Sequence, residues 1–410
     1  MCSAELPPAP RGLRLHIGLF GRRNVGKSSL LNALTRQQVA IVSPQPGTTT
    51  DPVEKPMELL PLGPVLFVDT AGLDDEGALG AARTARSRGV LDRVDLGILV
   101  AERGAWGGFE AGLLAELRAR GVPTVVALNK QDLAPGSGLP SLEGTAVVPV
   151  SARTGEGLEA LRAALLAAAP GDRVDSQRLL SDLVPPGEVA VLVMPIDASA
   201  PKGRLILPQV MAIRDVLDGA GLAMVVQARE LSKALSALKH LPALVVTDSQ
   251  AFQSVARDVP DAVPMTSFSI LMSRLQGDLA AQARGAFAMD GLRPGDRVLV
   301  AEGCTHHPTA EDIGRVKLPN WLAEKAGGPL QCDTVQGRDF PAELGPYRLV
   351  VHCGNCMGNR AEMRARIRRC EAAGVPITNY GLAIAHALGI LERALVPFPD
   401  VLESLHAQQA

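Results

Sequence analysis

The chain has 410 residues, of which 47% are hydrophobic but only 3% aromatic, and its 41 basic and 43 acidic side chains leave a formal net charge of −2. At about 150 residues per domain, this length suggests two or three domains, each able to bury a core. The balanced charge and the few aromatic side chains do not favour nucleic-acid binding. No stretch approaches the ~20 apolar residues needed to span a bilayer. The first apolar stretch, 13–20, leads into a glycine-rich turn and is expected to be a strand rather than a signal peptide. We therefore expect a cytoplasmic protein with no membrane partner.

The first block, residues 1–170, alternates short apolar segments with helical stretches. This order predicts an α/β domain whose strands form a mainly parallel sheet with right-handed crossovers. The expected strands are 15–20, 65–69, 96–101, 122–128 and 147–150. The polar, proline-containing stretch 170–187 is typical of a linker.

Two further α/β blocks are predicted, giving three consecutive α/β domains. Residues 180–262 contain expected strands at 189–195, 223–226 and 243–247, but no phosphate loop or ligand cluster, so we interpret them as a dimerisation or scaffolding domain. Residues 265–410 begin with an expected helix, 268–287. Two strands follow, 297–301 and 349–352, and then a helix, 359–373, and a strand and helix within 377–391.

A phosphate loop follows the first strand and opens a helix. Its backbone amides would wrap around the phosphates, and the helix N-terminus would add positive charge. Lys27 would reach the β- and γ-phosphates, and the Ser28 hydroxyl would bind Mg²⁺. The loop residues expected to bind the nucleotide are Gly21, Asn24, Val25, Gly26, Lys27, Ser28 and Ser29.

Three companion motifs follow in order and select the nucleotide. Asp69 closes a strand and would hold the magnesium-bound water, while the Gly72 amide would sense the γ-phosphate. In the segment that includes Asn129, Lys130 and Asp132, the Asp132 carboxylate would accept two hydrogen bonds from guanine that adenine cannot supply. Ser151 and Ala152 would offer a backbone amide to the guanine oxygen. The four motifs predict a GTPase that binds GTP and Mg²⁺.

The arrangement resembles the Era/TrmE-like branch of GTPases, with residues 46–51 in the place of the first switch loop. The resemblance implies that Thr49 completes the Mg²⁺ shell. Leu73 stands where Ras-like enzymes carry a water-orienting glutamine, so that mechanism is absent. Asn24 matches the asparagine with which potassium-activated members hold K⁺, although it would also serve as a simple loop cap. We expect slow, K⁺-activated hydrolysis, with Lys27, Thr49 and Asn24 as the catalytic residues.

Two clusters of metal-ligand residues follow strands of the third block. The first is Cys304-Thr-His306, and the second is His352-Cys353-Gly-Asn-Cys356. Strand ends are where open α/β sheets place their sites. The set of sulfur and nitrogen ligands suits structural zinc or an iron–sulfur cluster, and the absence of any metal stays open at this stage.

The whole pattern resembles the [FeFe]-hydrogenase H-cluster maturation GTPases. The resemblance implies a [4Fe-4S] cluster on Cys304, Cys353 and Cys356, and a scaffold that passes a di-iron precursor to the apo-hydrogenase. It also implies a homodimer and radical-SAM maturases as partners. The fourth iron would take an exchangeable ligand, His352 or else His306, although either histidine would also serve by hydrogen bonding to the cluster.

Other interpretations compete with this one. A ribosome- or tRNA-associated GTPase with a C-terminal zinc site would share the first domain, and so would an iron–sulfur enzyme driven by GTP hydrolysis. Cys332 and Cys370 have no partners at ligand spacing and are expected to be ordinary thiols. The arginines Arg360, Arg364 and Arg368 form either a solvated helix face or a cationic rim that holds an anionic precursor or an acidic partner.

Overall fold

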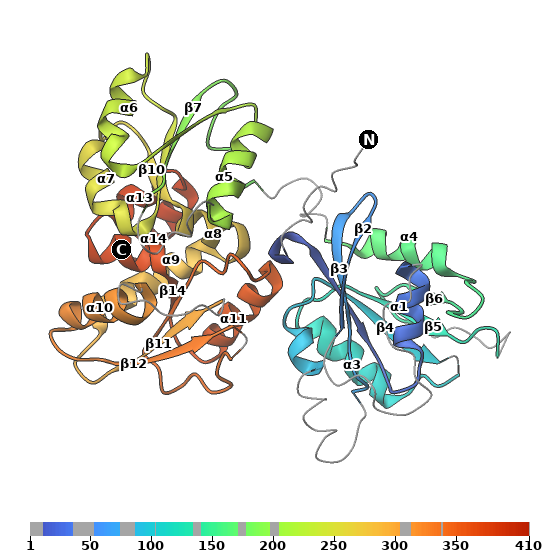
Figure 1. Ribbon diagram of the computed structural model, residues 1–410. Coiled ribbons are helices and arrows are strands. Elements are labelled where there is room, and N and C mark those ends of the chain that lie inside the picture. Colours follow the sequence, from blue (N-terminus) through green and yellow to red (C-terminus); the bar gives the residue numbers. More distant parts are fainter. Residues whose placement is uncertain are drawn as a thin grey trace. The chain divides into compact units, whose positions relative to one another are not determined.

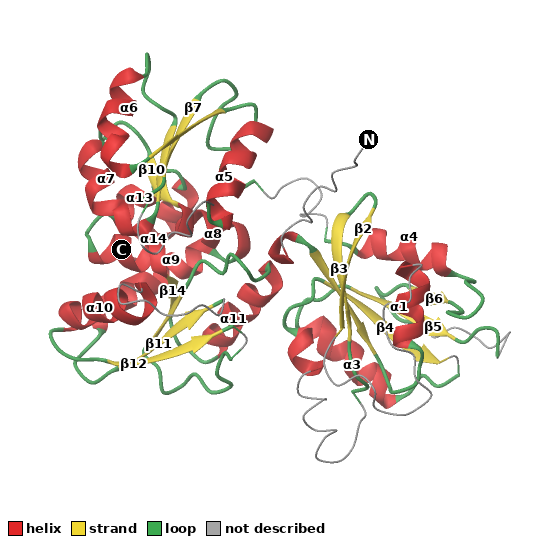
Figure 2. Ribbon diagram, viewed as in Figure 1, coloured by secondary structure: helices red, strands yellow, loops and turns green. Residues whose placement is uncertain are grey.

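The computed structural model describes residues 11–35, 53–73, 87–102, 104–133, 141–170, 178–196, 205–303, 313–337 and 339–409. The chain divides into two compact units, 1–176 and 177–410 (Figure 1). Both units contain helices and sheets (Figure 2), so the predicted α/β fold class is confirmed. The finer division into domains 1–170, 180–262 and 265–410 stays a prediction, because the second unit holds both remaining sheets. Among the described residues, no helix combines the length and apolar character that a membrane crossing needs.

The first unit is built on a six-stranded sheet with the order β2-β3-β1-β4-β5-β6. All pairs are parallel except β2 with β3. The strands are β1 Leu15–Phe20, β2 Val53–Leu59, β3 Gly63–Asp69, β4 Leu96–Glu102, β5 Thr124–Asn129 and β6 Val147–Pro149. The antiparallel β2 was not predicted, because its half-exposed, proline-containing sequence lacks the continuous apolar run of a central strand.

Helices cover both faces of this sheet. The helices are α1 Lys27–Thr35, α3 Gly108–Ala119 and α4 Leu158–Ala168. Leu30 of α1 and Leu161 of α4 pack on one face with Ile17, whereas Leu117 of α3 packs on the other face with Phe20. The central strand β1 is buried along its whole length, as parallel strands between two helical layers are.

The second unit contains two four-stranded, parallel sheets. The first has the order β10-β9-β7-β8, with β7 Val189–Val193, β8 Leu222–Val226, β9 Leu244–Thr247 and β10 Met265–Ser267. The second has the order β12-β11-β13-β14, with β11 Arg297–Glu302, β12 Gln331–Gln336, β13 Leu349–His352 and β14 Ile377–Asn379. The edge strands β10 and β12 were not predicted, and β10 belongs to the first of these sheets although its residues fall in the predicted third block.

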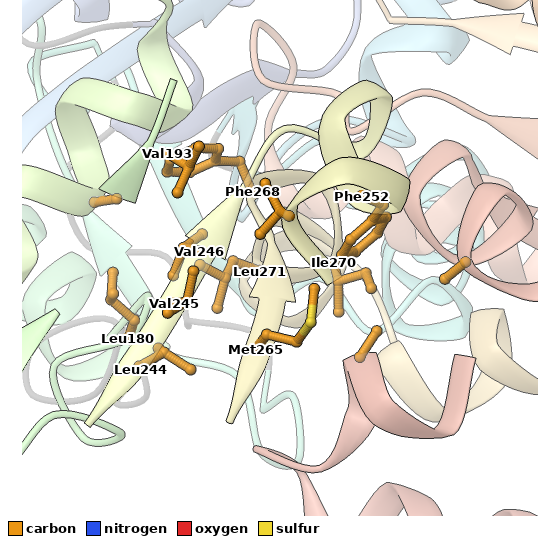
Figure 3. Packing of buried hydrophobic residues seen from close by; sticks show 14 of the residues in the cluster. Leu180, Val193, Leu244, Val245, Val246, Phe252, Met265, Phe268, Ile270 and Leu271 are labelled. Carbon is orange, nitrogen blue, oxygen red and sulfur yellow. The ribbon is translucent and has the colours of Figure 1, made fainter. Parts of the chain in front are cut away.

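Helices lie around and between these two sheets (Figures 1 and 2). The first sheet carries α5 Leu207–Asp218, α6 Leu231–Ala237 and α7 Phe252–Asp258. The next helices are α8 Phe268–Gln276 and α9 Leu279–Phe287, followed by α10 Leu318–Ala326, α11 Arg360–Ala372, α12 Tyr380–Ala387, α13 Leu391–Leu395 and α14 Pro399–Gln409. One core joins strands of the first sheet to α8, α9 and α12; Figure 3 shows Val245 and Met265 packed near Ile270 and Leu271.

Two expectations about this unit were wrong in detail. The stretch 170–187 is not a linker throughout, because Leu179, Leu180 and Val184 are buried in the core. The single helix expected at 268–287 is two helices. α8 ends at Gln276 with Gly277 as its C-cap, and the Asp278 side chain caps α9 by accepting a hydrogen bond from the amide of residue 281.

Candidate functional site

The phosphate loop joins the end of β1 to α1, and two of its glycines are required by the packing around them. Gly21 (φ +144°) and Gly26 (φ +96°) both have positive φ angles. A Cβ at Gly21 would collide with the carbonyl oxygen of Val100, and one at Gly26 would collide with the side-chain amide of Asn129. The loop therefore lies directly against β4 and against the end of β5, where the predicted guanine-binding segment begins at Asn129.

Lys27 and Ser28, the residues predicted to bind a phosphate and Mg²⁺, begin α1 and are both held by hydrogen bonds. Lys27 Nζ donates hydrogen bonds to the carbonyl oxygens of Gly21 (3.1 Å) and Arg22 (2.7 Å), so its charge is held inside the loop. Ser28 Oγ donates to Asp69 Oδ2 at 2.6 Å. This contact brings together two of the three expected Mg²⁺-site residues.

Asp69 is 1% exposed, and its burial raises the pKa of the carboxyl group, against the opposing effects of Ser28 and Lys27. Its second oxygen, Oδ1, has no hydrogen-bond partner within the described residues. A buried acceptor without a partner costs stability unless another group meets it. A magnesium-bound water would supply that group, so the donor set fits Mg²⁺.

Asn129 connects the phosphate loop with the two guanine motifs. Its Nδ2 donates to the carbonyl oxygen of Val25 at 3.0 Å, and its Oδ1 accepts from the amide of Ala152 at 3.0 Å. The nearby Asp132 accepts a hydrogen bond from Ser151 Oγ at 2.6 Å and forms an ion pair with Arg153 Nε at 2.8 Å. The Ser151 hydrogen bond is the main reason that the pKa of Asp132 is lowered, which favours the ionised carboxylate that the predicted contact with guanine requires.

Four residues that sequence reasoning missed support these loops. Arg22 Nε donates to Glu110 Oε1 at 2.7 Å, and its guanidinium lies 4.5 Å from the centre of the Phe109 ring. Glu110 is 2% exposed and also accepts a hydrogen bond from the amide of Gly107, the residue before α3. Lys130 forms an ion pair with Glu102. No sequence motif predicts the roles of Glu102 and Glu110, because each contacts its basic partner only in the folded chain.

The structure describes only some of the remaining residues that were predicted to bind the nucleotide. Thr49 and the rest of the switch segment 46–51 lie outside the described residues. Asn24 is exposed at φ +59°, Ser29 is half-buried in α1 and Gly72 is buried after β3. Leu73 packs against an apolar cluster of the first unit and carries no group that would orient water.

A second candidate site lies at the end of β13, where Cys353 and Cys356 are both half-buried. Cys353 Sγ accepts hydrogen bonds from the amides of Gly303 (3.0 Å) and Asn355 (3.4 Å). Because β11 and β13 are parallel neighbours, with Ala301 opposite His352, the end of β11 lies beside the cysteine loop. Cys304 and His306 lie outside the described residues, although Cys304 follows Gly303 directly in the chain.

This loop fits thiolate ligands of a metal cluster. Backbone N–H groups directed at a cysteine sulfur stabilise negative charge there and tune such clusters. Asn355 has a positive φ of 53°, is 1% exposed, and fills the loop so closely that a Cβ at Gly303 or Gly358 would collide with it. Within the described residues no three His, Cys, Asp or Glu side chains gather as a metal site. Those residues include only two of the three predicted cysteines.

His352 is fully buried and uses both ring nitrogens within the protein. Its Nδ1 donates to the carbonyl oxygen of Cys353 at 2.7 Å, and its Nε2 accepts from Arg366 Nη1 at 2.7 Å. Burial and then the Arg366 charge lower the pKa of His352 to about 3, so the ring is neutral. This arrangement favours hydrogen-bonded support of the loop over ligation of the fourth iron. Ligation by His352 stays a prediction.

The two other described cysteines have the surroundings expected of ordinary thiols. Cys370 is completely buried in an apolar cluster, and burial raises the pKa of its thiol to about 12. Cys332 is half-buried in β12, and burial also raises the pKa of its thiol. Neither is close to forming a reactive thiolate at neutral pH.

Three family models match successive parts of the chain. Residues 16–130 match the 50S ribosome-binding GTPase model, residues 179–277 the hydrogen maturase F dimerization domain, and residues 280–397 the hydrogen maturase F tetramerization domain. The first unit therefore contains a GTPase domain, which binds GTP and Mg²⁺. The two domains of the second unit support oligomerisation.

Similar proteins of known name resemble mainly the GTPase part. The tRNA modification GTPase MnmE of Methylobacterium sp. (strain 4-46) is 43% identical over 174 residues, covering 40% of this chain and 36% of the relative. The GTPase Era of Stenotrophomonas maltophilia is 37% identical over 165 residues, covering 38% of this chain and 55% of the relative. The crystal structure of Aquifex aeolicus Era bound to GDP and aluminium fluoride covers 54% of this chain and 97% of its own, with a TM-score of 0.35 and 19% identity.

Proposed function

Because the chain belongs to the hydrogen maturase F family, we propose that it is a GTP-hydrolysing scaffold for assembly of the hydrogenase H-cluster. In this role it holds a [4Fe-4S] cluster, receives the di-iron precursor, and delivers it to apo-[FeFe]-hydrogenase, with radical-SAM maturases as upstream partners. The observation that carries the proposal is the loop after β13, where two half-buried cysteines and amides directed at Cys353 Sγ occur within a hydrogen maturase domain.

Cys353, Cys356 and Cys304 would hold the cluster. Three thiolates leave one iron with an exchangeable ligand, and that open position is the chemistry the cluster supplies to an incoming anionic precursor. The protein's own contribution is to fix the thiolates: the Gly303 and Asn355 amides orient Cys353, and His352 with Arg366 holds the end of β13.

The GTPase domain would hydrolyse GTP slowly with help from K⁺. Lys27 would neutralise charge on the phosphates, Thr49 would complete the Mg²⁺ shell, and Asn24 would help to hold K⁺ in place of an arginine finger. The alternative of a tRNA- or ribosome-associated GTPase rests on relatives that resemble the first unit alone, whereas both family models for the second unit describe a hydrogen maturase.

A homodimer would form through the exposed edge of the first sheet of the second unit. β8 is an edge strand, and it leaves Leu222 54% and Val225 46% exposed. Val210 and Leu217 of the neighbouring α5 are 48% and 57% exposed. An edge strand flanked by apolar side chains is suited to pair with the same strand of a second copy.

The decisive experiment is anaerobic preparation of the full chain, followed by iron, sulfide and zinc analysis and EPR of the reduced protein. Cys304→Ser, Cys353→Ser and Cys356→Ser should each lose most of the iron and fail to activate an apo-hydrogenase. Cys370→Ser provides a matched control that should keep the parental iron content and the ability to activate an apo-hydrogenase. Colourless protein with one zinc per chain would refute the scaffold role, and full iron after Cys304→Ser would refute the ligand set.

A further inference from the structure

A hollow of about 390 Å³ lies on the second unit, between the exposed face of α11 and the break that separates α8 from α9. Four arginines and two carboxylates line it: Arg274, Arg360, Arg364, Arg368, Asp278 and Glu371. The hollow therefore carries an excess of two positive charges, although the chain as a whole has a formal charge of −2. A positively charged hollow on a chain of negative net charge attracts acidic groups to that one place.

The arginines of α11 are arranged in a row along the hollow. Arg360, Arg364 and Arg368 are four residues apart, so they lie on one helix face and are spaced by about 6 Å along the axis. The side chains of Arg364 and Arg368 are exposed. Arginines at this spacing can each pair with a carboxylate, if the carboxylates recur at the same spacing along one face of a helix or an extended segment.

The opposite wall is held in place. Arg274 of α8 donates to Asp182 Oδ1 at 2.9 Å and to the carbonyl oxygen of Leu179 at 3.2 Å, and its guanidinium lies 5.5 Å from the centre of the Phe398 ring. Asp278 accepts a hydrogen bond from the amide of Ala281 in the first turn of α9, which partly neutralises its negative charge. The hollow thus has one fixed wall and, opposite it, a row of arginines of which Arg364 and Arg368 are exposed.

The character of the lining indicates what kind of partner the hollow accepts. Pockets for small molecules are mostly apolar and enclosed, whereas this lining is mostly charged and two of its arginines are exposed. Single-stranded nucleic acid binds on aromatic side chains, and none of the described residues that line the hollow is aromatic. The arrangement suits the many weak charge contacts of an acidic protein surface.

We propose that this hollow docks an acidic segment of a partner protein beside the cysteine loop. The proposal rests on the scaffold function, because α11 begins at Arg360, four residues after Cys356, so a segment bound along α11 would bring its protein to the site of precursor transfer. The row of arginines selects the partner by charge, and the carboxylates Asp278 and Glu371 disfavour segments that are acidic along their whole length.

The test uses the full-length protein and a fluorescein-labelled peptide that carries glutamate at every fourth position of an alanine-rich helix, followed by fluorescence anisotropy. The double variant Arg364→Glu/Arg368→Glu should weaken binding at least about tenfold, because like charges then face each other. The control Arg257→Glu/Arg348→Glu changes the net charge equally at exposed arginines of α7 and of the turn before β13, and should bind as the parent does. Raising the ionic strength should weaken the parent and the control together.

Equal weakening by the two double variants would refute the proposal, as would tighter binding of a single-stranded oligonucleotide of equal charge. GTP hydrolysis and iron content of Arg364→Glu/Arg368→Glu should equal those of the parent, so its defect would be specific to docking. If the parent binds the peptide but holds no iron, the scaffold function fails while the docking surface stands. If the parent holds its cluster but the peptide does not bind, the docking proposal alone fails.

Discussion

At the scale of the residue, Asn24 is the phosphate-loop side chain that we propose helps to hold K⁺. It occupies a left-handed backbone position, φ +59°, and its side chain is exposed beside the place where phosphates would bind. A replacement by alanine would strain this position by about 1–2 kcal/mol, whereas glycine adopts it freely. Asn24→Gly therefore removes the amide without disturbing the loop.

We expect the parent to hydrolyse GTP several-fold faster in K⁺ than in Na⁺ at equal ionic strength, because K⁺ held by Asn24 would offset charge in the transition state. Asn24→Gly should abolish the difference and leave the rate in Na⁺ nearly unchanged. Steady-state phosphate release in the two salts measures both rates. Equal rates in the parent would remove K⁺ from the mechanism.

The pair of His352 and Arg366 makes a second prediction at this scale. If His352 supports the loop through its hydrogen bonds, its loss and the loss of Arg366 should have the same consequence. His352→Ala and Arg366→Met should both keep most of the iron, shift the EPR signal of the reduced cluster in the same way, and lower the free energy of unfolding by about 1–3 kcal/mol.

Arg284→Met, at a half-buried arginine of α9, is the control for loss of an arginine away from the cysteine loop and should leave the spectrum unchanged. A shift caused by His352→Ala but not by Arg366→Met would show that the imidazole itself ligates iron. The hydrogen bonds of His352 would then have to rearrange when the cluster binds.

At the scale of the element, some strands could be predicted from the sequence and others could not. The central strands β1, β4, β5, β7, β11 and β13 carry nearly continuous apolar runs and were predicted within about two residues, because both of their faces are covered. The edge strands β2, β10 and β12 were missed. β2 and β12 are partly exposed and polar, and the three residues of β10 are too few to show a period.

The edge strand β8 has an apolar sequence typical of a buried strand, yet both Leu222 and Val225 are about half exposed. If that edge pairs with a second copy, Leu222→Lys/Val225→Lys should convert dimers or larger assemblies into smaller ones, because lysines on an edge oppose pairing. Light scattering after gel filtration measures the mass. Leu60→Lys, at a 79% exposed position in the first unit, is the control and should leave the mass unchanged. Unchanged mass in the β8 variant would place the interface elsewhere.

At the scale of the whole molecule, the sequence predicted individual motifs, but not the contacts that join them. Each motif is a short run of residues, so its spacing can be recognised along the chain. By contrast, the bridge from Asn129 to Val25 and Ala152 joins three motifs that are far apart in the chain. The carboxylate of Glu110 and the guanidinium of Arg366 likewise find their partners only after folding, so no spacing rule reveals them.

The two units have separate interiors, and this separation yields the last prediction. Among the described residues, each hydrophobic cluster belongs wholly to one unit, so neither unit depends on the other for its core. Lys27→Ala and Asp69→Asn should therefore lower the rate of GTP hydrolysis by about a hundredfold or more while the iron per chain stays at the parental value. Reciprocally, Cys353→Ser should lose iron and keep the parental rate of hydrolysis.

Iron content and the rate of phosphate release are measured on the same preparations of the parent and of each variant. Circular dichroism and the unfolding transition of each variant show whether it remains folded. A folded Lys27→Ala protein that has lost its iron would mean that the nucleotide site controls cluster retention. GTP hydrolysis would then act on the cluster itself, rather than only on the partners that the scaffold binds and releases.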